Sequence, residues 1–162
     1  LYNKLLSIRV LMVCLGNICR SPMADGLLRQ KVALNNLDIE VDSAGTANYH
    51  VGSAPDHRMI KTAAKNGTPI DFLRARQFSN HDFSAFDYIL VMDKSNYRNV
   101  CALAPDQLSQ EKVHLLLDFL SDEALEEVPD PYYGTETDFQ FVYDLLDRAT
   151  DSFLAKLKNY TK

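Results

Sequence analysis

Apolar residues occur along this chain either in short continuous runs or at the spacing of a helix face. Continuous runs rich in β-branched and apolar residues predict strands that are covered on both faces of a sheet. Such runs occupy residues 8–13, 87–92 and 113–116, and a shorter one lies at residues 37–41. We therefore expect a sheet of four strands.

Helix-like segments alternate with these runs. Residues 23–34 and 94–101 each lie between two predicted strands, and residues 56–65 end at Asn66-Gly67, a pair typical of helix ends. Toward the carboxy terminus, apolar side chains recur at four-residue spacing, which predicts a long helix that packs on the sheet. These side chains are Phe141, Leu145, Ala149, Phe153 and Leu157.

Alternation of strands and helices favours an α/β fold of three layers, in which a mainly parallel sheet carries helices on both faces. The segment between residues 67 and 87 follows neither pattern and is predicted as an irregular link. The chain has 162 residues, 46% of them hydrophobic, and no linker-like stretch, so we expect a single domain over residues 1–162. Ligands of such sheets bind beyond the carboxyl ends of the strands, where Cys14 follows the first strand.

Charge and cysteine content narrow the choice of partners and location. A formal net charge of -5 argues against binding to nucleic acid or to an anionic membrane. The apolar runs, such as residues 115–117, are too short to span a bilayer. Three cysteines in a chain of this length do not form a disulfide framework, which favours a cytoplasmic location. Because the sequence starts at Leu1 and not at Met, a processed secreted form is the open alternative.

A cysteine and an arginine six residues apart follow the first predicted strand directly. A loop of this length can turn its backbone N–H groups inward and form an anion site at the start of the next helix. Gly16 and Asn17 suit the tight backbone, and Arg20 can grip two phosphate oxygens. We therefore predict a phosphate-binding loop made of Leu15, Gly16, Asn17, Ile18, Cys19, Arg20 and Ser21.

The same loop favours reactivity at Cys14. A nearby cation and a helix amino terminus stabilise the thiolate, which is the nucleophilic form of cysteine. Ser21 and Pro22 predict the helix start, with the Ser21 hydroxyl as its cap. Nucleophile and anion site would thus coincide.

The segment 13–22 resembles the signature loop of the low-molecular-weight protein tyrosine phosphatases, and three later segments resemble that family in the same order. Residues 42–46 resemble the segment at its second strand, residues 91–96 its third strand and turn, and Asp130-Pro131-Tyr132-Tyr133 its general-acid loop. The likeness extends over nearly the whole chain. It implies four parallel strands in the order 2-1-3-4.

The resemblance also implies the roles of the site residues. Cys14 is the expected nucleophile that forms a phosphocysteine, Arg20 the phosphate clamp, and Asp130 the general acid and base, without a metal or other cofactor. Tyr49, Tyr132 and Tyr133 are the expected pocket residues, with Leu15 beside them in a slot too deep for phosphoserine. Asn17 and Ser43 are expected to support the loop. The implied substrate is a tyrosine-phosphorylated protein, a tyrosine kinase being one candidate.

Two further residues are singled out by the likeness. Cys19 is expected to form a reversible disulfide with Cys14 that shields the nucleophile from overoxidation. Many family members carry a histidine where this chain has Leu73, near enough to pair with the aspartate after the third strand. Asp93 must therefore have another partner here.

Three other functions remain as alternatives. Arsenate reductases share the loop and fold but need a further close pair of cysteines, and here the second half of the chain offers Cys101 alone. Protein arginine phosphatases of the family tend to carry threonine at the position of Ile18. A phosphopeptide-binding module without catalysis would usually lack the nucleophile, the arginine or the acid, and this chain has all three. Protein tyrosine phosphatase is thus the favoured function.

Overall fold

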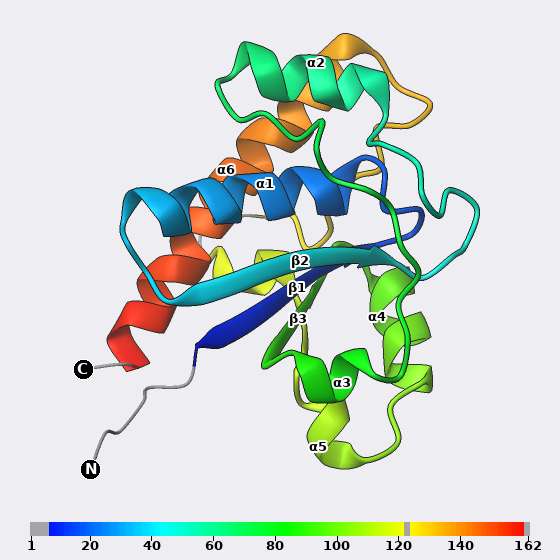
Figure 1. Cartoon of the computed structure of the whole chain (residues 1–162), viewed down its shortest axis with the longest axis vertical. Coiled ribbons are helices and arrows are strands. Elements are labelled where there is room, and N and C mark those ends of the chain that lie inside the picture. The colour runs from blue at the N-terminus through cyan, green and yellow to red at the C-terminus, as the bar shows by residue number, and fades with distance from the viewer. Residues whose placement is uncertain (1–6, 122–123, 161–162) are drawn as a thin grey trace.

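The sheet holds four parallel strands in the order β2-β1-β3-β4 (Figure 1). The computed structural model describes residues 7–121 and 124–160. The strands are β1 (Ile8–Cys14), β2 (Ile39–Gly45), β3 (Tyr88–Val91) and β4 (Val113–Leu115). Residue pairing is parallel at all three strand junctions, which confirms the predicted fold class and strand order.

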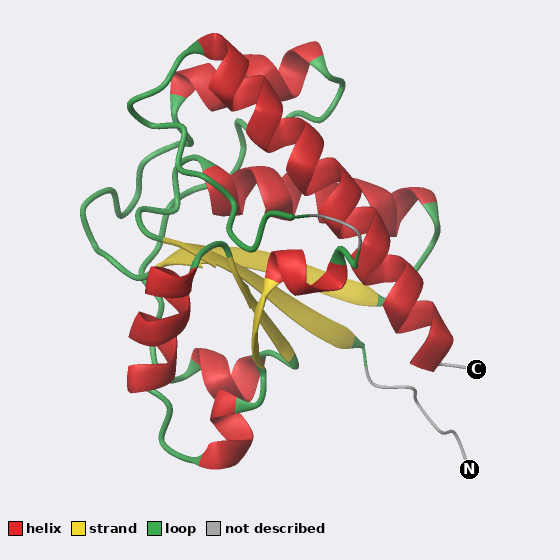
Figure 2. Cartoon of the chain, turned by 180° about the vertical axis from the view of Figure 1, so that it is seen from behind, coloured by secondary structure: helices red, strands yellow, loops and turns green. Residues whose placement is uncertain are grey.

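Helices cover both faces of the sheet, as predicted (Figures 1 and 2). One face carries α1 (Arg20–Leu34), α2 (His57–Lys65) and α6 (Glu136–Tyr160); the other carries α3 (Asp82–Ala85), α4 (Lys94–Ala102) and α5 (Gln107–Gln110). A short 3-10 helix, η1 (Leu116–Phe119), follows β4. Within the described part of the chain, no helix combines the length and the apolar character needed to cross a membrane.

β1 lies in the interior of the sheet, and its residues from Val10 to Cys14 are buried. Val10 and Met12 pack into the cluster formed with α1, α2 and α6, whereas Leu11 and Val13 pack into the cluster formed with α3 and α4. All four side chains have no exposed surface. Burial of alternate residues on opposite faces explains why the strand is a continuous apolar run rather than an alternating one.

The prediction of the buried face of α6 was wrong at its first residue. Phe141 is 44% exposed, while Phe153 is fully buried. Four residues turn an α-helix by about 40° more than one full turn, so side chains at strict four-residue spacing drift around the helix. The other four predicted residues, Leu145, Ala149, Phe153 and Leu157, are buried. The buried face is wider than predicted, because Phe139, Val142 and Leu146 also belong to it.

Several element boundaries also differ from the prediction. β2 extends to Gly45, because its pairing with β1 continues past Val41, where the predicted strand ended, through Asp42 and Ser43 to the buried Ala44. α3 and α5 were not predicted. Each has four residues, which is too short for a helical hydrophobic period to be recognised.

We predict that Phe153→Ala lowers the free energy of unfolding by about 3–5 kcal/mol. The Phe153 ring lies edge-to-face against Tyr88 at 5.4 Å and Phe119 at 5.0 Å between centroids, so truncation leaves a cavity between α6 and the sheet. Phe141→Ala on the same helix is the matched control and is expected to cost less than about 1 kcal/mol. Urea denaturation measures both, and equal losses would contradict the assigned burial.

Candidate active site

The predicted phosphate loop joins the end of β1 to the start of α1. Cys14 is the last residue of β1 and Arg20 the first residue of α1. The backbone turns through a left-handed residue at Asn17, whose φ is 57°. Gly16 does not have a positive φ, so its predicted backbone role was wrong. Its small size matters instead, because a Cβ there would lie 3.1 Å from the Cδ2 atom of His50.

The end of β2 and the two residues that follow it support the loop from the side. The backbone N–H of Thr46 donates to the carbonyl of Cys14, and that of Ala47 to the carbonyl of Leu15, both at 2.9 Å. A Cβ on Gly45 would lie 2.7 Å from the Leu15 carbonyl oxygen. Glycine is therefore required where β2 passes the loop.

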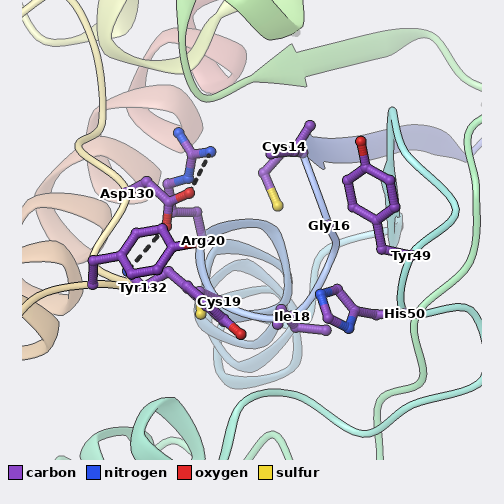
Figure 3. A pocket seen from close by; sticks show the side chains of 11 residues that line it. Cys14, Gly16, Ile18, Cys19, Arg20, Tyr49, His50, Asp130 and Tyr132 are labelled. Atoms are coloured by element: carbon purple, nitrogen blue, oxygen red, sulfur yellow. Dashed lines mark hydrogen bonds and ion pairs between the residues drawn. The ribbon is translucent and has the colours of Figure 1, made fainter.

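The Cys14 sulfur lies at the floor of a cavity of about 350 Å³. The backbone N–H of Asn17 lies 3.3 Å from Sγ, and the Ser21 hydroxyl lies 3.0 Å from it. Figure 3 shows the sulfur pointing into this cavity, between Arg20 and Tyr49. The Asn17 amide is a donor to the sulfur, and in the Cys14–Ser21 contact either atom can be the donor.

Ser21 does not cap α1 as predicted. The helix begins two residues earlier, its N-cap is Cys19, and no side chain caps it. The Ser21 hydroxyl bonds to Cys14 Sγ and accepts from Asn17 Nδ2 at 2.7 Å. The sequence pattern of a helix cap is therefore present, but the hydroxyl bonds to site residues and not to the backbone of α1.

Arg20 is buried and connects three parts of the site. Its Nη1 atom donates to Asp93 Oδ2 at 2.7 Å and to the Val128 carbonyl at 3.1 Å, and its Nη2 atom lies 3.6 Å from Asp130 Oδ2. Burial acts to lower the pKa of Arg20, but the negative charges of Cys14, Asp93 and Asp130 outweigh it and raise that pKa. The guanidinium therefore remains a cation in the pocket.

Asp93 has Arg20 as its partner in place of the missing histidine. Its second carboxylate oxygen accepts from the backbone N–H of Asn96 at 2.7 Å and caps α4. Leu73, at the position of that histidine, packs in the hydrophobic core. One carboxylate thus orients the arginine and starts a helix.

Asp130 lies on the loop that precedes α6, at the rim of the cavity (Figure 3). Its side chain is 45% exposed. Oδ1 accepts from the backbone N–H of Tyr132 at 3.1 Å, and Oδ2 faces Arg20. The carboxyl group is thus held near the cation yet open to a bound molecule.

Asn17 and Ser43 form a buried polar network behind the loop. Asn17 Nδ2 donates to Ser43 Oγ at 3.0 Å as well as to Ser21, and Asn17 Oδ1 accepts from the backbone N–H of Arg76 at 3.0 Å. Each polar atom of the Asn17 side chain therefore has a partner. This network fixes the left-handed turn that brings the loop amides together.

All three predicted pocket tyrosines line the cavity, together with Leu15, Gly16, Ile18 and Cys19. Tyr132 and Tyr133 meet edge-to-face with centroids 4.9 Å apart, and Tyr49 meets His50 in the same way at 6.4 Å. Cys19 is buried, and burial, followed by the charge of Asp56, raises the pKa of its thiol.

His50 also lines the cavity and was not predicted as a site residue. The single sequence signal was its position beside Tyr49.

This fold and site define a phosphatase of the kind in which an anion-binding loop carries a cysteine and an arginine at the carboxyl end of a parallel sheet. The family model described as low molecular weight phosphotyrosine protein phosphatase matches residues 9–162. The chain belongs to this family, and it is accordingly a protein-tyrosine phosphatase, a hydrolase. Membership implies phosphoproteins as substrates.

Known relatives and solved structures of this family match the chain over nearly its full length. The low molecular weight phosphotyrosine protein phosphatase of Schizosaccharomyces pombe is 42% identical over 154 residues, which are 93% of this chain and 97% of that protein. The human protein of the same name is 40% identical over 91% of this chain and 94% of its own length. The crystal structure of protein tyrosine phosphatase from Entamoeba histolytica superposes with a TM-score of 0.90 at 38% identity, covering 96% of this chain and all of that one.

Asn17→Ala is expected to lower both stability and activity. The substitution removes all three side-chain hydrogen bonds, and each buried group left unpaired costs about 1–3 kcal/mol. Asn36→Ala is the matched control, because Asn36 also has a positive φ, of 53°, but is exposed. Denaturation and turnover should both be affected far more by Asn17→Ala, and equal losses would mean that backbone strain, not the network, is what matters.

Asp25 on α1 is a buried carboxyl group behind this network. Its side chain has no exposed surface, and Oδ1 accepts from Arg29 Nε at 3.0 Å. Oδ2 has no hydrogen-bond partner among the described residues. Burial, only partly offset by Arg29, raises the pKa of Asp25 from 3.8 to about 6.

This raised pKa predicts a pH-dependent stability. A carboxyl group whose pKa is higher in the folded state contributes stability that is complete below its unfolded pKa of 3.8 and is lost as pH rises through about 6. The loss amounts to about 3 kcal/mol for a shift of roughly two units. Asp25→Asn should therefore match the wild type near pH 4 and be more stable near pH 7.5 in denaturant titrations. An unchanged pH dependence would contradict the prediction.

Proposed function

We propose that this chain hydrolyses phosphotyrosine through a phosphocysteine intermediate on Cys14. The observation that carries the proposal is the convergence of three groups on one cavity: the Cys14 sulfur, the Arg20 guanidinium and the Asp130 carboxyl group. Arg20 and Asp130 lie 3.6 Å apart at their nearest charged atoms. Nucleophile, charge stabiliser and proton donor are the three parts that this reaction needs.

In the first step, Cys14 attacks phosphorus in line while the phenolic oxygen leaves on the opposite side. The amides of the loop from Leu15 to Ser21 and the Arg20 fork bind the equatorial oxygens, whose charge grows in the transition state. Asp130, at the open rim, donates its proton to the departing phenol. The tyrosine leaves neutral, and a phosphocysteine remains.

In the second step, water attacks the phosphocysteine and Asp130 accepts its proton. The leaving group is now the Cys14 thiolate, and the hydrogen bonds from the Asn17 amide and the Ser21 hydroxyl stabilise it. Arg20 and the loop dipoles supply the charge stabilisation that a metal supplies in other phosphoryl-transfer enzymes. The proposed reaction therefore uses no cofactor.

The rim of the cavity supports a preference for tyrosine. Leu15, Tyr49 and Tyr132 offer apolar and aromatic surface above the sulfur, against which a phenol ring can pack. A phosphoseryl side chain is too short to bring its phosphorus to the floor of such a slot. Tyr133 extends the aromatic wall through its contact with Tyr132.

The proposed partner is a tyrosine-phosphorylated protein, with a tyrosine kinase as one candidate, and no nucleic acid. We further propose that residues 1–162 act as one domain in the cytoplasm, where a reduced thiol at Cys14 persists. The alternatives on the same fold are weaker. Cys101 lies in α4 and does not line the cavity, which leaves arsenate reduction without a resolving pair, and Ile18 lines the cavity where an arginine phosphatase would favour threonine.

We expect rapid phosphate release from a phosphotyrosyl peptide, and none from phosphoseryl or phosphoarginyl peptides, in buffer that contains a metal chelator. Cys14→Ser should reduce the rate about a thousandfold or more, because the nucleophile is lost. Asp130→Asn should lower kcat by about a hundredfold on phosphotyrosine, because its leaving group needs a proton.

The panel also separates the alternatives. Release from phosphoarginine alone would overturn the interpretation of Ile18. Activity that survives Cys14→Ser would exclude the phosphocysteine route. A Cys101→Ser variant is the matched control for cysteine substitution and should keep full activity.

A further inference from the structure

Arg58 lies in the first turn of α2, outside the cavity, and joins three separate elements around it. Its guanidinium pairs with Asp56 and contacts two aromatic rings, Tyr132 on the acid loop and Phe139 on α6. The mechanism above gives Arg58 no part. Its contacts nevertheless connect the phosphate loop with the wall of the pocket.

The first of these connections runs through Asp56, the N-cap of α2. The backbone N–H of Asp56 donates to the carbonyl of Ile18 at 2.8 Å, which fixes the amino end of α2 to the phosphate loop. The Asp56 carboxylate accepts from Arg58 Nε at 3.0 Å and from Nη2 at 2.8 Å. These hydrogen bonds hold the pKa of Asp56 below its usual value. The two-point contact fixes the plane of the guanidinium.

The second connection is made by the two rings. The guanidinium carbon lies 4.7 Å from the centroid of Phe139 and 5.4 Å from that of Tyr132, both within the range of a cation–π contact. Phe139 is fully buried in the core. Tyr132, in contrast, is more than a third exposed, so Arg58 is a main support for one side of its ring.

The position of Tyr132 also bears on the acid. Tyr132 donates its backbone N–H to Asp130 Oδ1, so ring and carboxyl group belong to one turn (Figure 3). A guanidinium anchored on Asp56 thus sets the distance between the aromatic wall and the loop that binds phosphate. That distance decides whether a phenol ring fits between them.

We propose that Arg58 is a positioning residue that holds the Tyr132 ring at the width required by an aryl phosphate. The proposal rests on the proposed function, since it concerns how the same pocket selects its substrate. Arg58 acts through Tyr132 and does not touch the substrate. Its loss should therefore weaken the recognition of the ring and leave the phosphate chemistry at Cys14 intact.

Three substrates separate these effects in the variant Arg58→Met. A phosphotyrosyl peptide has a ring and a poor leaving group, p-nitrophenyl phosphate has a ring and a good leaving group, and acetyl phosphate has a good leaving group and no ring. We expect KM to rise about tenfold for both ring substrates, because that change corresponds to the free energy of one cation–π contact. For acetyl phosphate, KM should change less than about twofold. Arg58→Lys keeps the cation but loses the two-point contact with Asp56, so its KM for the ring substrates should lie between those of the wild type and Arg58→Met.

The control and the double variant make the test decisive. Lys61→Met, on the same helix and paired with Glu136, should leave all three substrates unchanged. If Arg58 acts through the ring, Arg58→Met should add little to the effect of Tyr132→Ala, so the two effects should not add.

Other outcomes contradict the proposal. An equal loss on all three substrates, or a lowered melting temperature that accounts for the loss, would make Arg58 a general structural residue. A fall in kcat on phosphotyrosine alone would mean that Arg58 acts by positioning the Asp130 carboxyl group and not the Tyr132 ring. If the wild type hydrolysed acetyl phosphate but neither ring substrate, the proposed function itself would fail.

Discussion

The proposed chemistry depends on one constraint: the backbone from Cys14 to Arg20 must close around a tetrahedral anion with the sulfur beneath it. The backbone can close in this way because Asn17 adopts a left-handed conformation, and its buried side chain holds that conformation through three hydrogen bonds. β1 fixes one end of the loop and α1 the other. The absent side chain of Gly45 lets β2 pass against it.

A buried cation at the end of the loop requires partners, and these partners determine how the surrounding elements are arranged. Arg20 is paired with Asp93, which starts α4, and with the carbonyl of Val128 and the carboxyl of Asp130 on the acid loop. An unpaired guanidinium at this depth would be strongly destabilising. The same contacts that compensate its burial therefore bring the third strand and the proposed acid to the pocket.

The sequence predicted the features that short-range patterns encode. Continuous apolar runs predicted the strands of the sheet, because a strand such as β1 is buried on both faces. The spacing of Cys14 and Arg20 predicted the loop between β1 and α1. Features that depend on contacts between distant segments were not predictable. The Ser21 hydroxyl matched the pattern of a helix cap, but in the fold it bonds to Asn17 and to the Cys14 sulfur. Phe141 matched a four-residue spacing, but that spacing drifts away from the buried face of α6. The partner of Asp93 likewise became known only from the fold.

The most direct test of the account is to trap the intermediate. The enzyme is mixed rapidly with a phosphotyrosyl peptide, quenched during turnover, digested and analysed by mass spectrometry. The account predicts one phosphoryl group on the peptide that contains Cys14, attached to sulfur and therefore stable in alkali, where an acyl phosphate is cleaved. A phosphoryl group on another residue, or none at a time when tyrosine has been released in a burst, would contradict it.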